Sequence, residues 1–192
     1  MTNVAIDDAK LDALILFIVN RVENPADLGA TKLHKILWFS DLAMFANHGK
    51  SIAGETYIKM PQGPWGEHVE SSLDRLKASG LLAERREPHY NRMQRRFFPL
   101  QKTAERSRFS PEEISVVESM ISAICSHHTA TSISDFSHSS IWKMTRDKQP
   151  IPLDTVFAMN TVEPDAEDYM WAKEAYTSDV AAELSALMAR PS

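Results

Sequence analysis

Cysteine is almost absent from this chain, which has one, Cys125, among 192 residues. A single thiol cannot form an internal disulfide, which favours a protein of a reducing compartment. Long apolar runs are also missing, because the longest, ALILFIV at 13–19, is far shorter than the roughly 20 residues that cross a bilayer. The N-terminal residues show no basic stretch followed by an apolar one. We therefore expect a cytoplasmic protein with no membrane segment and no secretory signal.

Phosphate-binding motifs are missing as well. The stretch PQGPWG at 61–66 lacks the Lys-Ser/Thr pair of a P-loop and the spacing of G-x-G-x-x-G. Its two prolines also remove backbone N–H donors that a bound anion would need. Because proline restricts φ and glycine permits positive φ, we interpret this stretch as a rigid corner with Trp65 packed beneath it.

Two clusters contain some of the side chains of a known kind of site, one of a zinc site and one of a hydrolase triad, but neither contains the full set. Cys125 and His128 are three residues apart, and thiolate with imidazole suits zinc, yet no second Cys/His pair has matching spacing. Asp135 and His138 lie among serines, as in part of a hydrolase triad, without a recognisable nucleophile turn or oxyanion donors. The sequence therefore predicts no metal, no cofactor and no enzymatic activity, and it favours Cys125 as a small buried core residue.

Charge is distributed unevenly along the chain. The net charge is −5, but residues 75–108 contain ten basic and three acidic residues and carry +7, which leaves −12 for the remainder. The last thirty residues are especially acidic. Such polarity can steer an oppositely charged partner. Five arginines of the basic segment form the contact surface that charge predicts: Arg85, Arg86, Arg92, Arg95 and Arg96.

Hydrophobic periodicity predicts a mainly α-helical protein of the α+β class, with one compact helical domain. Helices are expected at about 11–22, 31–48, 64–79, from 111 and at 132–145, with a short strand at 56–60 and a β-hairpin of 82–87 and 92–100. Gly49 is placed to cap the second helix, and Ser110-Pro111 with Glu113 is a capping box. We expect the domain to cover residues 1–160. An acidic helical extension at 161–192 packs on it or trails from it.

The order helix, strand, helix, hairpin over residues 31–100 resembles a winged helix, in which the hairpin is the wing. A nucleic-acid-binding regulator that uses the hairpin 85–96 is therefore an alternative function. One helix of the usual three is missing, however, and the outward positions of the 64–79 helix begin with Glu67, Glu70 and Asp74. Carboxylates that face phosphates weaken binding, because DNA affinity depends largely on phosphate neutralisation.

Several short motifs, in order along the chain, resemble the Panacea domain, the SocA-like antitoxin family. KLHKILWF at 32–39, GKSI at 49–52 and the Gly-Pro turn at 63–64 are similar to its first part, and SHSSIWK at 137–143 to a later segment. Trp38 stands where the family usually has tyrosine, and Ile141 where proline is often found. The resemblance covers residues 10 to about 160. The motif positions are Lys32, Lys35, Trp38, Gly49, Gly63, Pro64, Trp65, His138 and Trp142.

The resemblance implies a bacterial or phage antitoxin, encoded beside a toxin in a prophage or mobile element, that silences the toxin by direct protein contact. Occlusion of the toxin's active surface and delivery to a protease or its adaptor both stay open. The motif positions are expected to be structural, with Lys32 and Lys35 as solvated lysines at a helix start and His138 and Trp142 in packing roles. The basic hairpin is the expected contact surface.

Overall fold

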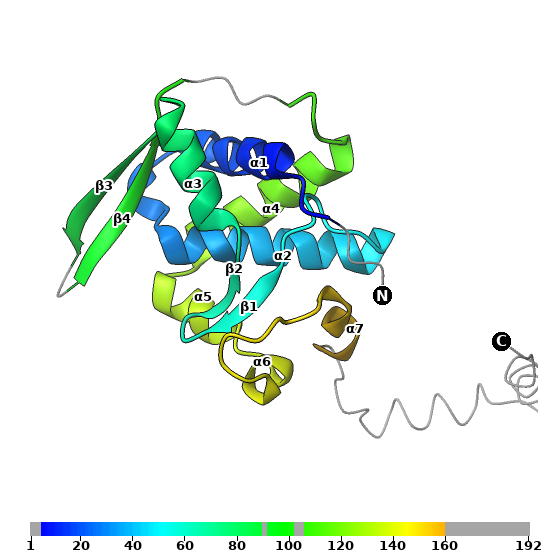
Figure 1. Ribbon diagram of the computed structural model, residues 1–192. Helices are drawn as coiled ribbons and strands as arrows, with labels where there is room; N and C mark the ends of the chain where they lie inside the picture. Colours follow the sequence, from blue (N-terminus) through cyan, green and yellow to red (C-terminus); the bar gives the residue numbers. More distant parts are fainter. Residues whose placement is uncertain (1–4, 90–91, 102–105, 160–192) are drawn as a thin grey trace, which may run out of the picture. The chain divides into compact units, whose positions relative to one another are not determined.

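The computed structural model describes residues 5–89, 92–101 and 106–159 (Figure 1). Within them the chain forms seven α-helices, two short 3₁₀ helices and two separate two-stranded sheets. The helices are α1 (Asp8–Arg21), η1 (Pro25–Asp27), α2 (Ala30–His48), α3 (Val69–Ala78), α4 (Pro111–His127), α5 (Ala130–Phe136), α6 (Ser140–Met144), η2 (Leu153–Thr155) and α7 (Val156–Met159). The strands are β1 (Tyr57–Met60), β2 (Gly63–Gly66), β3 (Leu82–His89) and β4 (Arg92–Pro99). The predicted mainly α, α+β class is confirmed.

Helix α2 is the centre of the fold. It runs through the middle of the molecule in Figure 1 and contacts α4, α5, α7 and β2. Leu33, Ile36, Leu37 and Trp38 are each at most 1% exposed, so the helix is buried on most sides, as its wide apolar stripe predicted. Gly49 ends α2 in the left-handed region, at φ 68°, which confirms the predicted cap.

The start of α4 shows the predicted capping box. The Ser110 Oγ accepts a hydrogen bond from the Glu113 N–H at 3.2 Å, and the Glu113 carboxylate accepts one from the Ser110 N–H at 2.9 Å. Glu113 also forms an ion pair with Lys10 of α1, with 2.7 Å between Nζ and Oε1. The same residues therefore begin α4 and attach it to α1.

The two sheets are antiparallel hairpins. In the first, Tyr57 pairs with Gly66 and Met60 with Gly63, and in the second the ladder runs from the pair Leu82–Pro99 to the pair His89–Arg92. The predicted short strand and the predicted hairpin are both confirmed. The short strand β1 pairs with β2 and not with the wing-like hairpin. Each of the two sheets has only two strands.

The predicted helix at 64–79 is wrong at its start, since α3 begins at Val69. Residues 63–66 are instead a strand, held extended by pairing with β1. Gly63 has φ 92°, which lies outside the helical region. Pro64 is compatible with a strand here because β2 has only one neighbour, and an edge strand tolerates a missing N–H.

The predicted helix at 132–145 is also wrong, because it consists of two short helices, α5 and α6. The break falls at residues 137–139, where the Ser139 side chain accepts a hydrogen bond from the Trp142 N–H at 3.3 Å and so begins α6. Serine side chains compete with helix hydrogen bonds in this way, and this favours a new cap over a continuous helix.

Residues 160–192 lie outside the described residues, and the predicted C-terminal helices fall within them. The predicted domain boundary near residue 160 and the acidic extension therefore stay predictions. Of the helices that the structure describes, none is long and apolar enough to cross a membrane.

Candidate functional site

Three motif segments that are far apart in the sequence meet at one point. Gly63 of β2 lies against Lys35 of α2 and Ser137 at the end of α5. A Cβ added at Gly63 would be 2.7 Å from the Lys35 Nζ and closer still to the Ser137 Oγ. The Lys35 Nζ donates a hydrogen bond to the Pro64 carbonyl at 2.6 Å. We call Lys35, Gly63, Pro64 and Ser137 the Lys35 junction.

Lys35 is fully buried, and Lys32 is only 8% exposed, so the prediction of two solvated lysines is wrong. The physical reason is that α2 is covered on most sides, so Lys35 faces β2 and α5 and Lys32 faces α4. Burial lowers the pKa of Lys35 to about 7, because a charged amine loses its hydration there. The Lys32 Nζ reaches the Cys125 carbonyl of α4 at 3.4 Å.

His138 and Trp142 lie beside this junction and stack on each other. Their rings are 3.7 Å apart at an angle of 9°, and the Trp142 Nε1 donates to the Met60 carbonyl of β1 at 3.2 Å. The Lys59 ammonium lies over the Trp142 ring, 4.5 Å from its centre. Burial lowers the pKa of His138. These contacts attach the segment around α6 to the β1–β2 hairpin.

His34 and Trp65 form a second stacked pair between α2 and β2. Their ring centres are 3.4 Å apart, and the His34 Nδ1 accepts a hydrogen bond from the Gly66 N–H at 3.0 Å. Burial lowers the pKa of His34 to about 4, so the imidazole is neutral near pH 7. Trp65 therefore packs on a histidine of α2, and this histidine holds the end of the same strand.

Asp41 is a further buried polar residue of α2. Its carboxylate accepts hydrogen bonds from the Ile52 N–H at 2.8 Å and the Tyr57 hydroxyl at 2.7 Å. Burial raises the pKa of Asp41 to about 6. Sequence reasoning missed His34 and Asp41. The sequence feature that could have revealed them is the absence of a polar face on α2, because a helix that is buried on all sides must also bury its polar residues.

The basic hairpin presents fewer free cations than its sequence suggests. Arg95 binds two carboxylates, with 2.7 Å from its Nε to Glu84 and 2.6 Å from its Nη1 to Glu70 of α3. Hydrogen bonds from Arg95, and to a smaller extent from Lys77, hold the pKa of Glu84 below its usual range. Arg95 thus ties the hairpin to α3.

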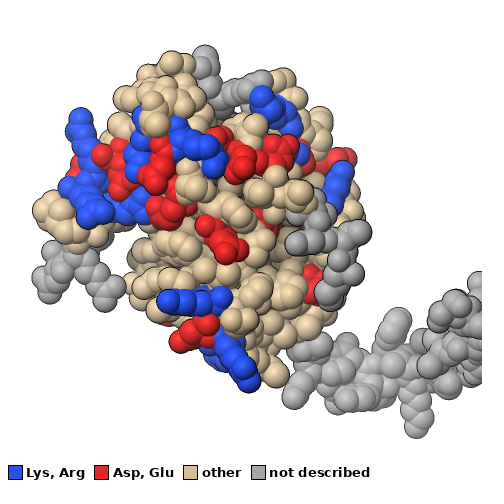
Figure 2. Space-filling view, viewed as in Figure 1, with Lys and Arg blue, Asp and Glu red and all other residues tan. Residues whose placement is uncertain are grey.

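The other hairpin arginines divide between the interior and the surface. Arg96 is 6% exposed, and its Nη1 lies 3.4 Å from the Pro25 carbonyl. Arg85 and Arg86 are exposed on β3, and the Arg85 guanidinium lies 5.4 Å from the Phe98 ring centre. The Arg92 side chain lies outside the described side chains. Figure 2 shows Lys and Arg side chains over the hairpin, at the left, interleaved with acidic ones.

A cleft of about 890 Å³ lies beside the hairpin. Its lining includes Lys32, Met93, Gln94, Cys125 and His128. Met93 is 61% exposed and supplies an apolar side chain next to charged residues. The cleft therefore combines an apolar contact with the cationic edge of the hairpin.

Cys125 and His128, singled out by their spacing, both border this cleft. Cys125 is half-buried, and burial raises the pKa of its thiol. His128 lies 3.2 Å from the Ser132 Oγ. Among the residues that the structure describes, no group of three or more His, Cys, Asp or Glu side chains is arranged to hold a metal ion.

Comparison with known proteins defines the class of the chain. The family described as Antitoxin SocA-like, Panacea domain, matches residues 33–143, which is more than half of the sequence. The chain therefore belongs to the SocA-like Panacea-domain family, as its motifs predicted. This membership supports an antitoxin-type role. No curated protein and no solved structure matches the chain.

Proposed function

We propose that this chain is the antitoxin of a toxin–antitoxin system and that it neutralises a toxin, encoded beside its own gene, by binding it directly in the cytoplasm. The observation that carries the proposal is family membership over residues 33–143. The role is binding and not catalysis. The polar groups of α2 support this, because Lys35 and Asp41 are buried and hold neighbouring backbone groups.

The motif positions have a structural role in this proposal. Lys35 and Trp38 are fully buried, and Gly63 leaves no space for a side chain. Buried side chains cannot touch a protein partner, so they specify the scaffold that the family shares. Residues that recognise a particular toxin must then be exposed ones.

The contact surface that we propose is the outer part of the hairpin with its cleft. Arg85 and Arg86 are exposed, and Met93 adds an exposed apolar side chain. Arginine and methionine are both enriched in protein interfaces. Arg95 and Arg96 support this surface from within, because both are held by contacts inside the molecule.

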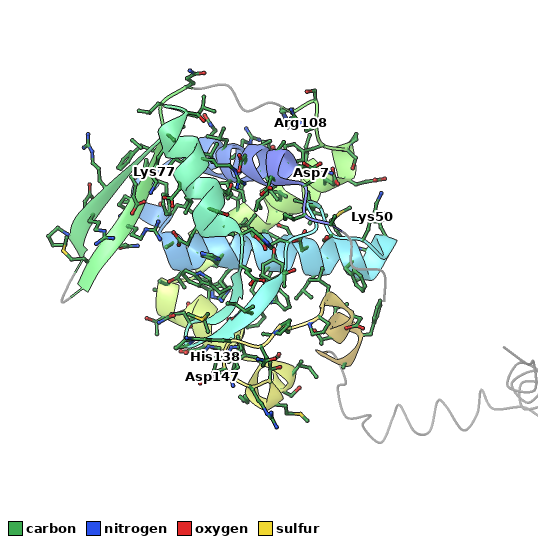
Figure 3. All side chains as sticks on the ribbon, viewed as in Figure 1. Asp7, Lys50, Lys77, Arg108, His138 and Asp147 are labelled. Carbon is green, nitrogen blue, oxygen red and sulfur yellow. The ribbon has the colours of Figure 1, made fainter. Side chains whose placement is uncertain are left out.

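Growth rescue tests the proposal. The product of the adjoining reading frame is expressed alone and together with this chain, and we expect co-expression to restore growth. The double variant Arg85→Glu/Arg86→Glu should rescue poorly, while Lys50→Glu should rescue like the wild type. Lys50 is exposed just past the end of α2 and far from the hairpin in Figure 3.

The fate of the toxin separates two mechanisms. Occlusion leaves the toxin at full abundance in a complex with this chain. Delivery to a protease or its adaptor instead lowers toxin abundance when the chain is present. Failure of both growth rescue and co-purification would reject the proposed function.

A further inference from the structure

The last turn of α6 and the loop that follows it carry the most exposed large apolar side chain of the described residues. Met144 is 82% exposed, and Lys143, Arg146 and Lys148 around it are exposed too. The acidic residue of this stretch, Asp147, lies 3.5 Å from the Lys59 ammonium. The patch is therefore positive on a chain whose net charge is −5, and it forms the blue area at the bottom of Figure 2.

This loop is held firmly on the edge of β1. The Lys148 N–H donates to the Lys59 carbonyl at 2.9 Å, and the Lys59 N–H donates to the Gln149 carbonyl at 2.9 Å. The Lys59 ammonium also donates to the Thr145 carbonyl at 2.8 Å. Asp147, labelled in Figure 3, marks the position of this loop beside the β1–β2 hairpin. A surface ordered before binding loses little conformational entropy when a partner docks.

The backbone of the loop is strained at one position. Lys148 has φ 62°, and no other non-glycine residue that the structure describes has positive φ. The left-handed conformation costs an ordinary residue on the order of 1 kcal/mol, and glycine adopts it freely. Strained residues of this kind are concentrated at functional sites. Here the strained position carries an exposed lysine, where a glycine would fit the turn better but supply no charge.

We propose that Lys143, Met144, Arg146 and Lys148 form a second contact surface of this antitoxin, which receives an acidic segment of the toxin with an apolar side chain over Met144. This inference rests on the proposed function and adds a surface to it. An apolar centre within a charged rim is the usual anatomy of a protein interface. Phosphates would use the cations alone, so the exposed methionine favours a protein over a nucleic acid.

The surface lies at the C-terminal end of the family match, where Lys143 is the last matched residue. Residues 144–148 follow directly after the matched residues 33–143. The scaffold that positions the loop, including Lys59 and Trp142, lies inside the match. Residues inside the family match therefore hold the loop in place. Residues 144–148, beyond the match, can differ between family members and so recognise one particular toxin.

The test uses the full chain and the product of the adjoining reading frame as the probe, with affinity measured by calorimetry. The triple variant Lys143→Glu/Arg146→Glu/Lys148→Glu should bind about tenfold to hundredfold more weakly at low salt, and this loss should shrink at high salt. Lys148→Gly is the informative single variant, because it should raise the melting temperature and still weaken binding. Lys50→Glu is the matched control and should bind like the wild type.

The outcomes separate this inference from the proposed function. If the wild type does not bind the probe, both are overturned. If the wild type binds and the triple variant binds equally well, this inference alone is overturned. Salt-sensitive binding of labelled DNA or RNA that the triple variant loses, with toxin binding unchanged, would assign the surface to nucleic acid and would also overturn it.

Discussion

At the scale of single residues, Lys35 explains why the motifs belong together. Its amine is fully buried and bound to the Pro64 carbonyl, and no carboxylate among the described residues forms an ion pair with it. Its pKa of about 7 means that the amine is largely neutral in mildly alkaline solution. A lysine in this state acts as a hydrogen-bond donor inside the core and not as a surface charge.

The burial of the Lys35 amine should make the free energy of unfolding rise with pH. Its pKa is about 7 in the folded protein and 10.5 in the unfolded chain, so between these values the unfolded chain binds more protons. The free energy of unfolding should therefore increase from pH 7 to about 9.5, by up to about 1.4 kcal/mol per pH unit. Urea denaturation at a series of pH values measures this slope. Lys35→Met should remove most of it, and parallel curves for the two proteins would contradict the assignment.

Gly63 is the second residue with a specific prediction. Gly63→Ala places a methyl group against Ser137 and Lys35 at a backbone φ of 92°, and should lower stability by about 2–4 kcal/mol. Gly49→Ala is the matched control, because φ there is 68° but no atom lies within 4 Å of the added Cβ. It should cost only about 1 kcal/mol. Thermal denaturation compares them, and equal losses would show that contact at Gly63 is unimportant.

The variant Gly63→Val tests whether the Lys35 junction contacts a partner or only stabilises the fold. Because Gly63 is buried, Gly63→Val should lower the melting temperature before it changes affinity for a partner. A Gly63→Val protein with unchanged thermal stability and lost toxin binding would identify this corner as a contact site.

At the scale of elements, the hairpin is fixed by one arginine and exposes others. Arg95→Met removes an ion-pair partner of Glu70 and one of the two cations bound to Glu84, and should lower stability by about 1–3 kcal/mol, because Glu84 is only 12% exposed. Arg86→Met on the exposed strand should change stability by less than about 0.5 kcal/mol. Denaturant unfolding of both variants measures the difference. The opposite order would mean that the hairpin is not held through Arg95.

The elements that the sequence predicted correctly are those determined by local signals. The apolar breadth of α2, the cap at Gly49 and the capping box at Ser110 each lie within one short segment. Strand β2 was missed because Pro64 next to Gly63 also suits a helix start, and only pairing with β1 decides between them. The burial of Lys35 could not be predicted for the same reason, since its partners come from β2 and α5.

At the scale of the whole molecule, buried motifs and exposed charges have different roles. The Lys35 junction joins α2, β2 and α5 in the interior. The hairpin is attached through Arg95 to α3, and the loop after α6 is attached through Lys59 to β1. This arrangement explains how one scaffold can present different contact residues. For the alternative, a nucleic-acid-binding regulator, Arg95 and Arg96 are held internally, which leaves Arg85 and Arg86 as the exposed arginines among the described hairpin side chains.

Direct binding between purified proteins tests the proposed function most directly. The product of the adjoining reading frame is titrated into this chain in a calorimeter. We expect a complex with a dissociation constant on the order of 10⁻⁷ M or tighter, as is typical of specific protein interfaces. Arg85→Glu/Arg86→Glu should weaken binding about tenfold with an unchanged melting temperature. Absence of binding between the two folded proteins would contradict the proposed antitoxin function.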